Sequence, residues 1–460
     1  MTQTAVVDAA GPMSDPHVVI VGCGFGGLSV ARALRRVPVR ITVLDRSNHH
    51  LFQPLLYQVA TAMLSPAHIA SPIRGLVGHQ RNASVFLSDV VGVDVGGQCV
   101  LIDAHDHFAR IPFDFLVLAT GVNQSYFGRR EFERFAPGLK TLADAVAVRN
   151  KILEAFELAE TGENADTHRE LLTFVLVGAG PTGVEMAGAI ASLIRNTLWH
   201  EFRRIDPRSA RIVIIDRDRR ILPSFAEDLS RAAHERLVRL GVEIRLGHAV
   251  DTIDDRGVVV GGERIASRTV IWTAGVEPTP VARWLNAETD RSGRVRVLPD
   301  LSVPGHPGVF AIGDVASLEQ DGRPLPGVAQ VAIQQGRHVA RTIERRLASR
   351  PAPPPFRYFD KGNMAVVGRN FAIIQSGRFK LAGLVAFFAW AAVHLGFLAQ
   401  SSLRLTVFVQ WIWTYVTSQP GSRLIVRPRE TDAAAAASPG RSPTPAHVGD
   451  AELNCAVERS

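Results

Sequence analysis

The chain has 460 residues, 46% of them hydrophobic and 21% charged, which is enough for two or three globular domains. The formal net charge of +7 is small and the arginines are scattered, so no nucleic-acid partner is expected. Cys23, Cys99 and Cys455 lie far apart without a C-x-x-C motif, which argues against a disulfide scaffold, a metal site and dithiol redox chemistry.

The first glycine-rich motif begins at residue 17. Residues 17–34, HVVIVGCGFGGLSVARAL, predict a strand, a turn and a helix. Gly22, Gly24 and Gly27 have the G-x-G-x-x-G spacing of dinucleotide-binding folds. The first glycine makes the turn, the second lets the backbone approach a pyrophosphate, and the third lets helix and strand pack closely. A second apolar strand, VRITVLD, ends in Asp45, where an acid accepts hydrogen bonds from ribose hydroxyls.

The same arrangement occurs again in mid-chain. The sequence LLTFVLVGAGPTGVEMAGAIASLI predicts a strand, a turn containing Gly178, Gly180 and Gly183, and a helix rich in small residues. A further strand, RIVIID, ends in Asp216. One glycine-rich turn is a weak signal, because such turns also arise without ligands. Two copies, each with its strand, helix and terminal acid, predict two bound dinucleotides.

The second copy departs from the standard spacing. Residues 199–210, WHEFRRIDPRSA, are expected to extend the helix and form a surface turn. Asp216 favours NADH through hydrogen bonds to ribose, but the adjacent Arg217 and Arg219 could accommodate a 2′-phosphate. The choice between NADH and NADPH therefore stays open.

Later strands end in turns that suit the same class of fold. Residues 113–122, FDFLVLATGV, and 268–278, RTVIWTAGVEP, each follow one glycine-rich turn and close on Thr, Ala and Gly. The sequence VFAIGDVA places Gly313 and Asp314 after a strand, where a carboxylate and a helix N-terminus could hold a ribitol and a phosphate. Alone, Gly-Asp is only a turn signal.

The C-terminal region follows a Pro-rich break at 349–356. Residues 381–399 are apolar, with His394 as their only ionisable member, and reach the lower limit of ~17–25 residues for a transmembrane helix. Residues 405–416 are shorter and rich in aromatics. A spanning helix, a buried core helix and an element in the membrane surface are all open interpretations. A single span would carry the basic run SRLIVRPR across the membrane, which the positive-inside rule disfavours.

Both ends of the chain are expected to be disordered. Residues 1–16 contain Asp8 and Asp15, no basic residue and no long apolar core, so no signal peptide is predicted. Residues 428–460 are rich in Ala, Ser and Pro.

Together these motifs resemble the two-dinucleotide-binding flavoproteins and, among them, the type II NADH:quinone oxidoreductases. The resemblance extends from about residue 17 to about residue 427. The stretches that carry it are HHLFQPLLYQVATAMLSPAHIASPIR (49–74), GPTGVEMAG (180–188), VAQVAIQQGRHVA (328–340), FDKGNMAVVGR (359–369) and WAAVHLGFLAQSSLRLTVFVQWIWTYVT (390–417).

The resemblance implies an α/β fold with two Rossmann-like dinucleotide-binding domains, the NAD domain inserted in the FAD domain, and a C-terminal membrane-associating helical region. The expected parts are an N-terminal tail at 1–16, the first part of the FAD-binding domain at 17–145, the NADH-binding domain at 146–290, the second part of the FAD-binding domain at 291–350, a membrane-anchoring domain at 351–427 and a tail at 428–460.

The resemblance also implies roles for single residues. FAD would be held by Gly22, Gly24, Gly27, Asp45, Gly313 and Asp314, and NADH by Gly178, Gly180, Gly183 and Asp216. Glu185 would lie at the junction of nicotinamide and flavin, and Gln330 and Gln334 would face the quinone head. Tyr57 would help shape the flavin-side tunnel, and Lys361 would lie near the quinone entrance.

These residue types suit the implied chemistry. Glutamine supplies neutral hydrogen-bond donors for quinone carbonyls, and Glu185 could relay a proton if burial raises its pKa. From the residues alone, a structural role for Glu185, Gln330 and Gln334 is favoured over a catalytic one, since polar residues are more often solvated or structural.

The implied protein is a flavoenzyme that passes a hydride from NADH to FAD and then two electrons to a membrane quinone, without pumping protons. It would be monotopic on the lipid bilayer at the cytoplasmic face of the cell membrane, and members of the family often form homodimers. Two alternatives remain: a soluble ferredoxin-reductase-like NAD(P)H flavoprotein, with no need for residues 381–416, and a non-catalytic NADH/flavin redox sensor. A disulfide reductase or a sulfide:quinone reductase would need a cysteine pair, and Cys23 lies inside the first glycine turn.

Overall fold

The structure is a computed structural model that describes residues 15–103 and 108–426. The expected tails, 1–16 and 428–460, therefore lie outside the described residues, apart from residues 15 and 16.

The first of two large sheets carries the first glycine turn. Its strand order is β20-β21-β9-β1-β2-β5, and only β20 runs antiparallel to its neighbour. Its strands are β1 (His17–Val21), β2 (Arg40–Asp45), β5 (Ala83–Leu87), β9 (Phe115–Leu118), β20 (Ser302–Val303) and β21 (His306–Ala311). The central strands are continuous runs of buried β-branched and leucine residues, as expected for a parallel sheet covered on both faces.

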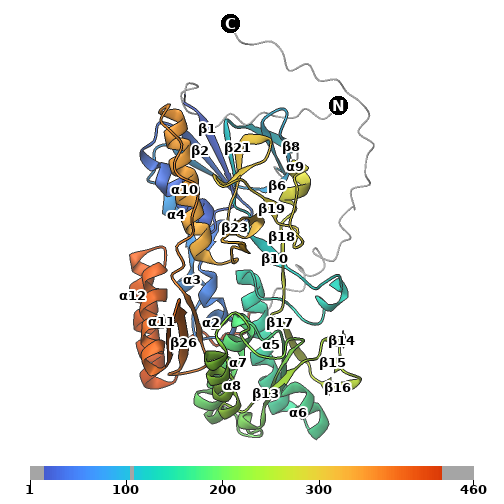
Figure 1. Cartoon of the computed structure of the whole chain (residues 1–460). Helices are drawn as coiled ribbons and strands as arrows, with labels where there is room; N and C mark the ends of the chain where they lie inside the picture. The colour runs from blue at the N-terminus through green and yellow to red at the C-terminus, as the bar shows by residue number, and fades with distance from the viewer. Residues whose placement is uncertain (1–14, 104–107, 427–460) are drawn as a thin grey trace. The chain divides into compact units, whose positions relative to one another are not determined.

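Two helices pack closely on one another beside this sheet (Figure 1). Helix α1 (Phe25–Ala33) follows the first glycine turn, and α10 (Ala329–Leu347) follows the last strand. A Cβ atom at Gly336 would stand 2.6 Å from the carbonyl oxygen of Gly26, so the glycine is what allows the helices to approach. Strand β21 pairs with β9 although some 190 residues separate them, which returns the chain to its first sheet.

The second large sheet is four-stranded and wholly parallel, in the order β13-β12-β11-β17. Its strands are β11 (Thr173–Val177), β12 (Arg211–Asp216), β13 (Val242–Leu246) and β17 (Thr269–Trp272). The associated helices are α5 (Leu142–Thr161), α6 (Ala165–Leu171), α7 (Pro181–Asn196) and α8 (Glu227–Arg239). The stretch 199–210 does not extend α7, which ends at Asn196. Two short 3₁₀ helices follow α7 instead, Leu198–His200 and Pro207–Ser209. The second begins at a proline, which lacks the backbone donor of a continuing α-helix.

The remaining strands form small sheets. They are β3 (His49–Leu51) with β4 (Ala70–Pro72); β6 (Asp89–Asp94), β7 (Cys99–Asp103) and β8 (Phe108–Pro112); β14 (Val250–Asp254), β15 (Gly257–Val260) and β16 (Glu263–Ala266); β19 (Val295–Arg296) with β22 (Ala316–Ser317); and β23 (Glu319–Gln320) with β24 (Arg323–Pro324). The short helices are α2 (Leu56–Ala60), α3 (Pro66–Ile69), α4 (Ile73–Val77) and α9 (Val281–Leu285), with 3₁₀ turns at Leu34–Arg36, Gln53–Leu55, Arg130–Phe132 and Gly313–Val315.

A two-stranded antiparallel ribbon joins the segments that leave the two large sheets. Strand β10 (Val122–Gln124) follows β9, and β18 (Val276–Pro278) follows β17. They pair with Asn123 opposite Glu277. The two Thr/Ala/Gly turns that stood out in the sequence are therefore neighbours in space.

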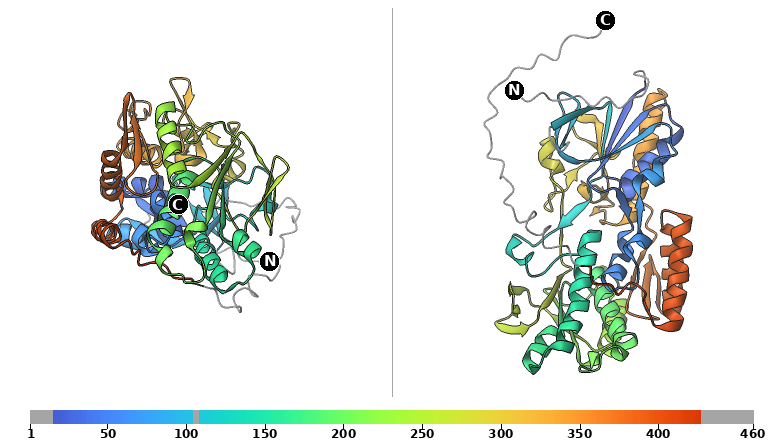
Figure 2. Two further views of the ribbon diagram at one scale, coloured as in Figure 1. Left: turned by 90° about the horizontal axis from the view of Figure 1, so that it is seen from below. Right: turned by 180° about the vertical axis from the view of Figure 1, so that it is seen from behind.

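The C-terminal region is a three-stranded sheet followed by a helical hairpin. Strands β25 (Asn363–Val366), β26 (Ala372–Ser376) and β27 (Phe379–Gly383) are antiparallel, and helices α11 (Leu384–Phe397) and α12 (Ser401–Thr417) lie side by side next to them (Figures 1 and 2).

The apolar segment 381–399 is thus not one long helix. Its first three residues belong to β27, and α11 has 14 residues, which makes it about 21 Å long against a hydrocarbon core of about 30 Å. Within the described residues, the structure has no helix with both the length and the hydropathy needed to cross a membrane.

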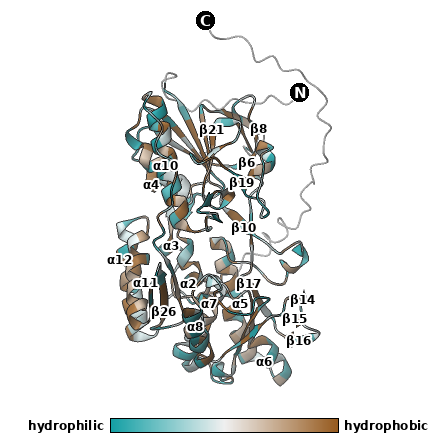
Figure 3. Cartoon of the chain, in the orientation of Figure 1, coloured by the Kyte–Doolittle hydropathy of each residue, from teal (hydrophilic) through white to brown (hydrophobic). Residues whose placement is uncertain are grey.

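Few residues of the hairpin enter the core. Ala386, Trp390, Leu398 and Val407 join the large hydrophobic cluster that also contains α5, α7 and the strands of the second sheet. Most other apolar residues of α11 and α12 are exposed, and Figure 3 shows hydrophobic segments along both helices.

Candidate functional site

The two glycine turns have the same geometry. Gly22 and Gly178 adopt φ values of +91° and +115°, which are strained for any residue with a side chain. A Cβ atom at Gly27 would lie 1.9 Å from the carbonyl oxygen of Gly22, and one at Gly183 would lie 1.9 Å from that of Gly178. The first and third glycines are therefore required by the fold itself.

The middle glycines have a different surrounding. A Cβ atom at Gly24 or Gly180 would meet no heavy atom within 4 Å. Each stands at the N-cap of the helix that follows, where backbone N–H groups are free of intrahelical partners. Open space beside a helix N-terminus is what a pyrophosphate needs, so both turns fit a dinucleotide.

Both predicted acids lie at their glycine turns and make matching hydrogen bonds. The Asp45 carboxylate accepts from the backbone N–H of Cys23 at 2.6 Å and from that of Ser47 at 2.7 Å. The Asp216 carboxylate accepts from the N–H of Ala179 at 2.5 Å and from that of Asp218 at 2.9 Å. Each acid therefore holds the turn in shape, and each carboxylate oxygen keeps a lone pair for another donor.

The Gly-Asp turn after β21 is held by a residue that the sequence left without a role. The N–H of Gly313 donates to Oε1 of Gln335 at 2.6 Å, and Gln335 is 1% exposed. Burial raises the pKa of Asp314, and the nearby Lys140 opposes that rise. Among the described residues no group donates a hydrogen bond to the Asp314 carboxylate, so this acceptor fits the hydroxyls of a ribitol chain.

Gln330, Gln334 and Lys361 come to one region, where α10 meets residues 359–361. Both ends of the Gln334 amide bind the backbone of Phe359: its Nε2 donates at 2.9 Å and its Oε1 accepts at 3.0 Å. Gln330 lies one helical turn earlier on α10. The Lys361 Nζ lies 5.7 Å from the ring centroid of Phe397, at the end of α11. Gln334 thus fastens the C-terminal region to α10 and retains one amide hydrogen.

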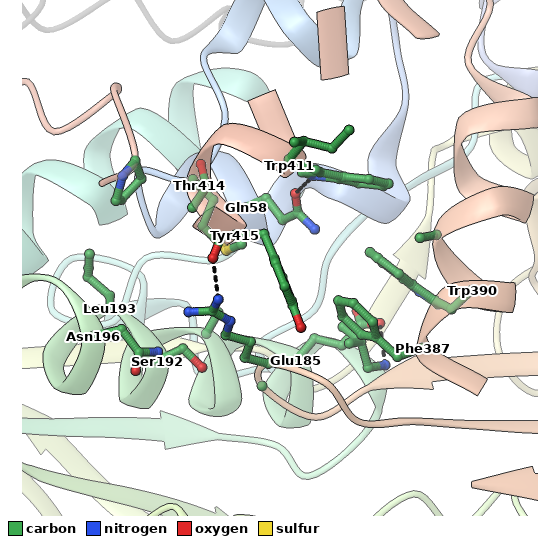
Figure 4. Close-up of a pocket in the computed structure, with 18 of the residues that line it drawn as sticks. Gln58, Glu185, Ser192, Leu193, Asn196, Phe387, Trp390, Trp411, Thr414 and Tyr415 are labelled. Atoms are coloured by element: carbon green, nitrogen blue, oxygen red, sulfur yellow. Dashed lines mark hydrogen bonds between the residues drawn. The ribbon is translucent and has the colours of Figure 1, made fainter. Parts of the chain in front are cut away.

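Tyr57 and Glu185 line a separate, mostly apolar cavity of about 390 Å³ between α7 and the α11–α12 hairpin (Figure 4). Ser192, Leu193 and Asn196 continue its wall along α7, and Phe387, Trp390, Trp411 and Tyr415 close it from the hairpin. The other polar edge is Arg369, which donates to Ser418 Oγ at 3.2 Å and to the carbonyl of Tyr415.

The apolar surroundings decide the protonation of these two groups. Burial raises the pKa of Glu185 to about 8, against one weak hydrogen bond from the N–H of Val366 at 3.4 Å. Burial, with a smaller effect of the Glu185 charge, raises the pKa of Tyr57 well above its usual value. At neutral pH the carboxyl of Glu185 therefore carries a proton that it can give.

Two residues that the sequence analysis did not single out connect this pair to the hairpin. Gln58, which is 2% exposed, donates from Nε2 to the Tyr57 hydroxyl at 3.0 Å and accepts at Oε1 from the Trp411 indole N–H at 2.8 Å. No spacing rule could have joined Gln58 to Trp411, because 353 positions separate them.

His394, the only ionisable residue of 381–399, is neutral. Burial lowers its pKa to about 4, and its Nδ1 lies 2.7 Å from the carbonyl oxygen of Trp390. That carbonyl can only accept, so Nδ1 carries the hydrogen. Its ring lies edge-on to Phe52, with the centroids 6.2 Å apart.

The sequence profile of the family described as pyridine nucleotide-disulphide oxidoreductase matches residues 16–336, a range that contains both glycine turns, and this defines the class of the protein. The type II NADH:quinone oxidoreductase Ndh of Mycobacterium tuberculosis is 44% identical over 427 residues, covering 90% of this chain and 91% of that protein. NdhA of the same organism is 41% identical over 408 residues, covering 86% of each chain. The solved structure of NDH2 from Plasmodium falciparum in complex with NADH has a TM-score of 0.82 at 17% identity, covering 90% of this chain and 100% of that one.

The chain belongs to the type II NADH:quinone oxidoreductase family. This membership confirms the enzyme class and the cofactors, FAD and NADH, that were predicted from the sequence. The similarity to the solved structure confirms the mixed α/β fold. The roles of single residues and the domain boundaries stay predictions.

The second glycine turn yields a matched pair of variants. Gly183→Ala should destabilise the protein by about 1–3 kcal/mol, because its Cβ would overlap the backbone of Gly178. Gly180→Ala should leave stability within about 0.5 kcal/mol but weaken NADH binding, because its Cβ would fill the open side of the turn. Denaturant unfolding and NADH titration measure the two effects, and equal unfolding midpoints for both variants would contradict the assignment.

Burial of Glu185 makes stability depend on pH. Its pKa rises from 4.5 to about 8 on folding, so the stability it contributes is complete below pH 4.5 and is lost as pH rises toward 8. The free energy of unfolding of the wild type, relative to Glu185→Gln, should therefore fall by up to about 1.4 kcal/mol per pH unit across that window. Urea unfolding from pH 5 to 8 measures it, with Glu235→Gln on α8 as a surface control. A difference that stays constant would show that Glu185 is solvated.

Proposed function

We propose that residues 17–145 and 291–350 bind FAD, that residues 146–290 bind NADH, and that residues 351–427 hold the protein on a membrane where it reduces a quinone. Bound FAD supplies hydride acceptance from NADH and electron donation to the quinone. The chain's own task is to hold both dinucleotides in line and to exclude water. The matched glycine turns with Asp45 and Asp216, and the carboxylate of Asp314, support this division.

Quinone reduction also needs protons. The overall reaction, NADH + H⁺ + quinone → NAD⁺ + quinol, leaves two protons on the quinone oxygens. Gln330 and the remaining amide hydrogen of Gln334 are the proposed neutral donors to a quinone carbonyl. Glu185, in the separate cavity between α7 and the hairpin, is the proposed source of a proton for the reduced quinone and takes another from solvent, and its pKa of about 8 suits that exchange. Lys361 lies beside Phe397, where the quinone would enter.

The observation that carries the proposal is the arrangement of the cavity. An acid that is protonated at neutral pH stands at the inner side of an apolar cavity, and the wall of that cavity is a helical hairpin with an apolar outer surface. A soluble ferredoxin reductase or a redox sensor has no need of such a hairpin. A quinone with an apolar tail does, because it stays in the lipid and must meet the flavin there.

The outer surface of the hairpin is the proposed membrane contact. The exposed apolar side chains that do not line the cavity are Leu384, Val385, Val393, Phe397, Leu405, Val409, Trp413 and Val416. Phe388, Phe408, Ile412 and Tyr415 are also exposed and border the cavity. Contiguous apolar patches of this kind mark membrane or protein contacts on soluble chains. Arg378, Lys380 and Arg404 flank the hairpin; Arg378 and Arg404 suit the anionic cytoplasmic face of a membrane, and Lys380 forms an ion pair with Asp228 at 2.8 Å. A homodimer is also part of the proposal, on the family resemblance alone.

The two half-reactions test the function. NADH should bleach the flavin of the purified holoenzyme, and a water-soluble short-chain quinone should restore its colour. Gln330→Ala should slow flavin reoxidation roughly 10-fold while flavin reduction by NADH stays within about twofold, because only the quinone carbonyl loses a donor. Stopped-flow absorbance follows both steps, with Arg337→Ala on the exposed face of α10 as the control. A flavin that NADH does not bleach would end the enzyme assignment, and equal slowing of both steps would reject the role of Gln330.

Membrane binding is tested by two valines of similar exposure in different helices. Val409 on α12 is 56% exposed and Val238 on α8 is 53% exposed. Val409→Asp should weaken binding to anionic lipid vesicles roughly 10-fold or more, because it removes buried apolar area and places a charge in the lipid. Val238→Asp should bind as the wild type does. Vesicle co-sedimentation measures both, and equal losses for the two variants would show that the hairpin is not the contact.

A further inference from the structure

The hydrogen bonds around Gln58 have one consistent direction. The indole N–H of Trp411 is a donor only, so the Gln58 atom that faces it at 2.8 Å must be the carbonyl oxygen. The amide nitrogen of Gln58 therefore faces Tyr57 and donates to the phenol oxygen at 3.0 Å. The donor and acceptor capacities of Trp411 and Tyr57 thus fix the orientation of this buried amide.

This direction determines what the hydroxyl of Tyr57 can do. Its oxygen already accepts from Gln58, so its own hydrogen must be donated to a different group. Tyr57 is 5% exposed, and a buried hydroxyl rarely leaves its hydrogen without an acceptor.

Neutral side chains that can accept a hydrogen bond line the cavity, namely Ser192, Asn196, Thr197, Thr414 and Ser418. Besides Tyr57 itself, the titratable and charged groups that line it are Glu185 on α7, Arg369 between β25 and β26, and Tyr415 on α12. Arg369 is a donor only, and it binds Ser418 and the Tyr415 carbonyl while its guanidinium stacks 4.3 Å from the Tyr415 ring centroid. Glu185 is the acid whose charge acts on the Tyr57 hydroxyl.

We propose that Gln58 and Trp411 are positioning residues that keep the hydroxyl of Tyr57 a hydrogen-bond donor on the Glu185 side of the cavity. The inference rests on the proposed function of Glu185 as proton donor. It adds that the acid is tuned from the hairpin: Trp411 orients Gln58, Gln58 orients Tyr57, and Tyr57 stabilises the carboxylate that remains after Glu185 has given its proton. A helix with an exposed apolar face thereby reaches the reacting groups through two hydrogen bonds.

The pH dependence of flavin reoxidation by a water-soluble quinone tests this. The rate should fall as pH rises through about 8, as Glu185 loses its proton. In Trp411→Phe the amide of Gln58 is free to turn its carbonyl toward Tyr57, which then donates to Gln58. The carboxylate of Glu185 loses that donor, so its pKa rises. The pH at which the rate of flavin reoxidation falls should therefore increase by about 0.5–1 unit. Tyr57→Phe should produce a shift of the same direction and size.

Three further variants separate this effect from general loosening. Trp411→Phe in the Tyr57→Phe background should add no shift, since both act through one hydroxyl. Gln58→Met removes both bonds but gives Tyr57 no competing carbonyl acceptor, so it should shift the pH profile less than Trp411→Phe does. Val407→Ala, which removes a buried hairpin side chain but leaves the Trp411 donor, should leave the profile where it is. The flavin spectrum and the rate of flavin reduction by NADH report whether each variant is folded.

Two kinds of result would contradict the positioning role of Gln58 and Trp411. An unchanged pH profile in Trp411→Phe would overturn the inference. A full shift by Trp411→Phe in the absence of the Tyr57 hydroxyl, or an equal shift in Val407→Ala, would overturn it too. Glu185→Gln separates the two levels. If the rate still falls near pH 8 in Glu185→Gln, Glu185 is not the proton donor. If the fall disappears in Glu185→Gln but Trp411→Phe has the wild-type pH profile, only the positioning role is wrong.

Discussion

The properties of the site depend on one energetic cost: ionising the carboxyl of Glu185 where water is excluded. Glu185 stands among the aromatic side chains of α11 and α12, and desolvation disfavours its ionised form. The same wall that keeps water from the acid forms the hairpin whose other side is exposed and apolar. If the hairpin moved away, Glu185 would meet water, its pKa would fall and its proton would be lost at neutral pH. Shape and protonation are therefore set by the same helices.

The fold repeats one solution to one problem. A dinucleotide needs free backbone N–H groups beside open space, but a turn with few side chains is poorly fixed. In both sheets the answer is an aspartate at the end of the neighbouring strand that accepts from the residue between the first two glycines, Cys23 in one turn and Ala179 in the other. Each aspartate therefore stabilises its glycine turn even without a bound ribose, which explains why Asp45 and Asp216 occupy the same place in each copy.

The sequence predicted the parts that depend on local rules. Strand, glycine turn, helix and terminal acid follow from spacing, and both copies fold as that pattern indicates. Contacts between distant segments could not be read this way. Gln335 on the Gly313 turn, Gln334 on Phe359 and Gln58 on Trp411 all join an amide to a group far along the chain, and amides carry no periodic signature. The length of α11 was also missed, because residues 381–383 are as apolar as the helix yet pair as a strand.

Helix α11 is apolar on all sides, although some of its side chains are buried in the core and others are exposed. Amino-acid composition alone does not distinguish these two groups. Ala386 and Trp390 are buried against the core, while Leu384, Val385 and Phe388 point to the surface. A helix with core on one side and water on the other would be amphipathic, so an apolar outer face supports the proposed membrane contact. The aromatic residues are divided accordingly: the rings of Trp390 and Trp411 lie on the inner side with their centroids 5.5 Å apart and their planes tilted by 30°, and Trp413 is exposed on the outer side. The indole N–H of Trp411 thus donates to Gln58 inside the protein and is not available to a lipid headgroup.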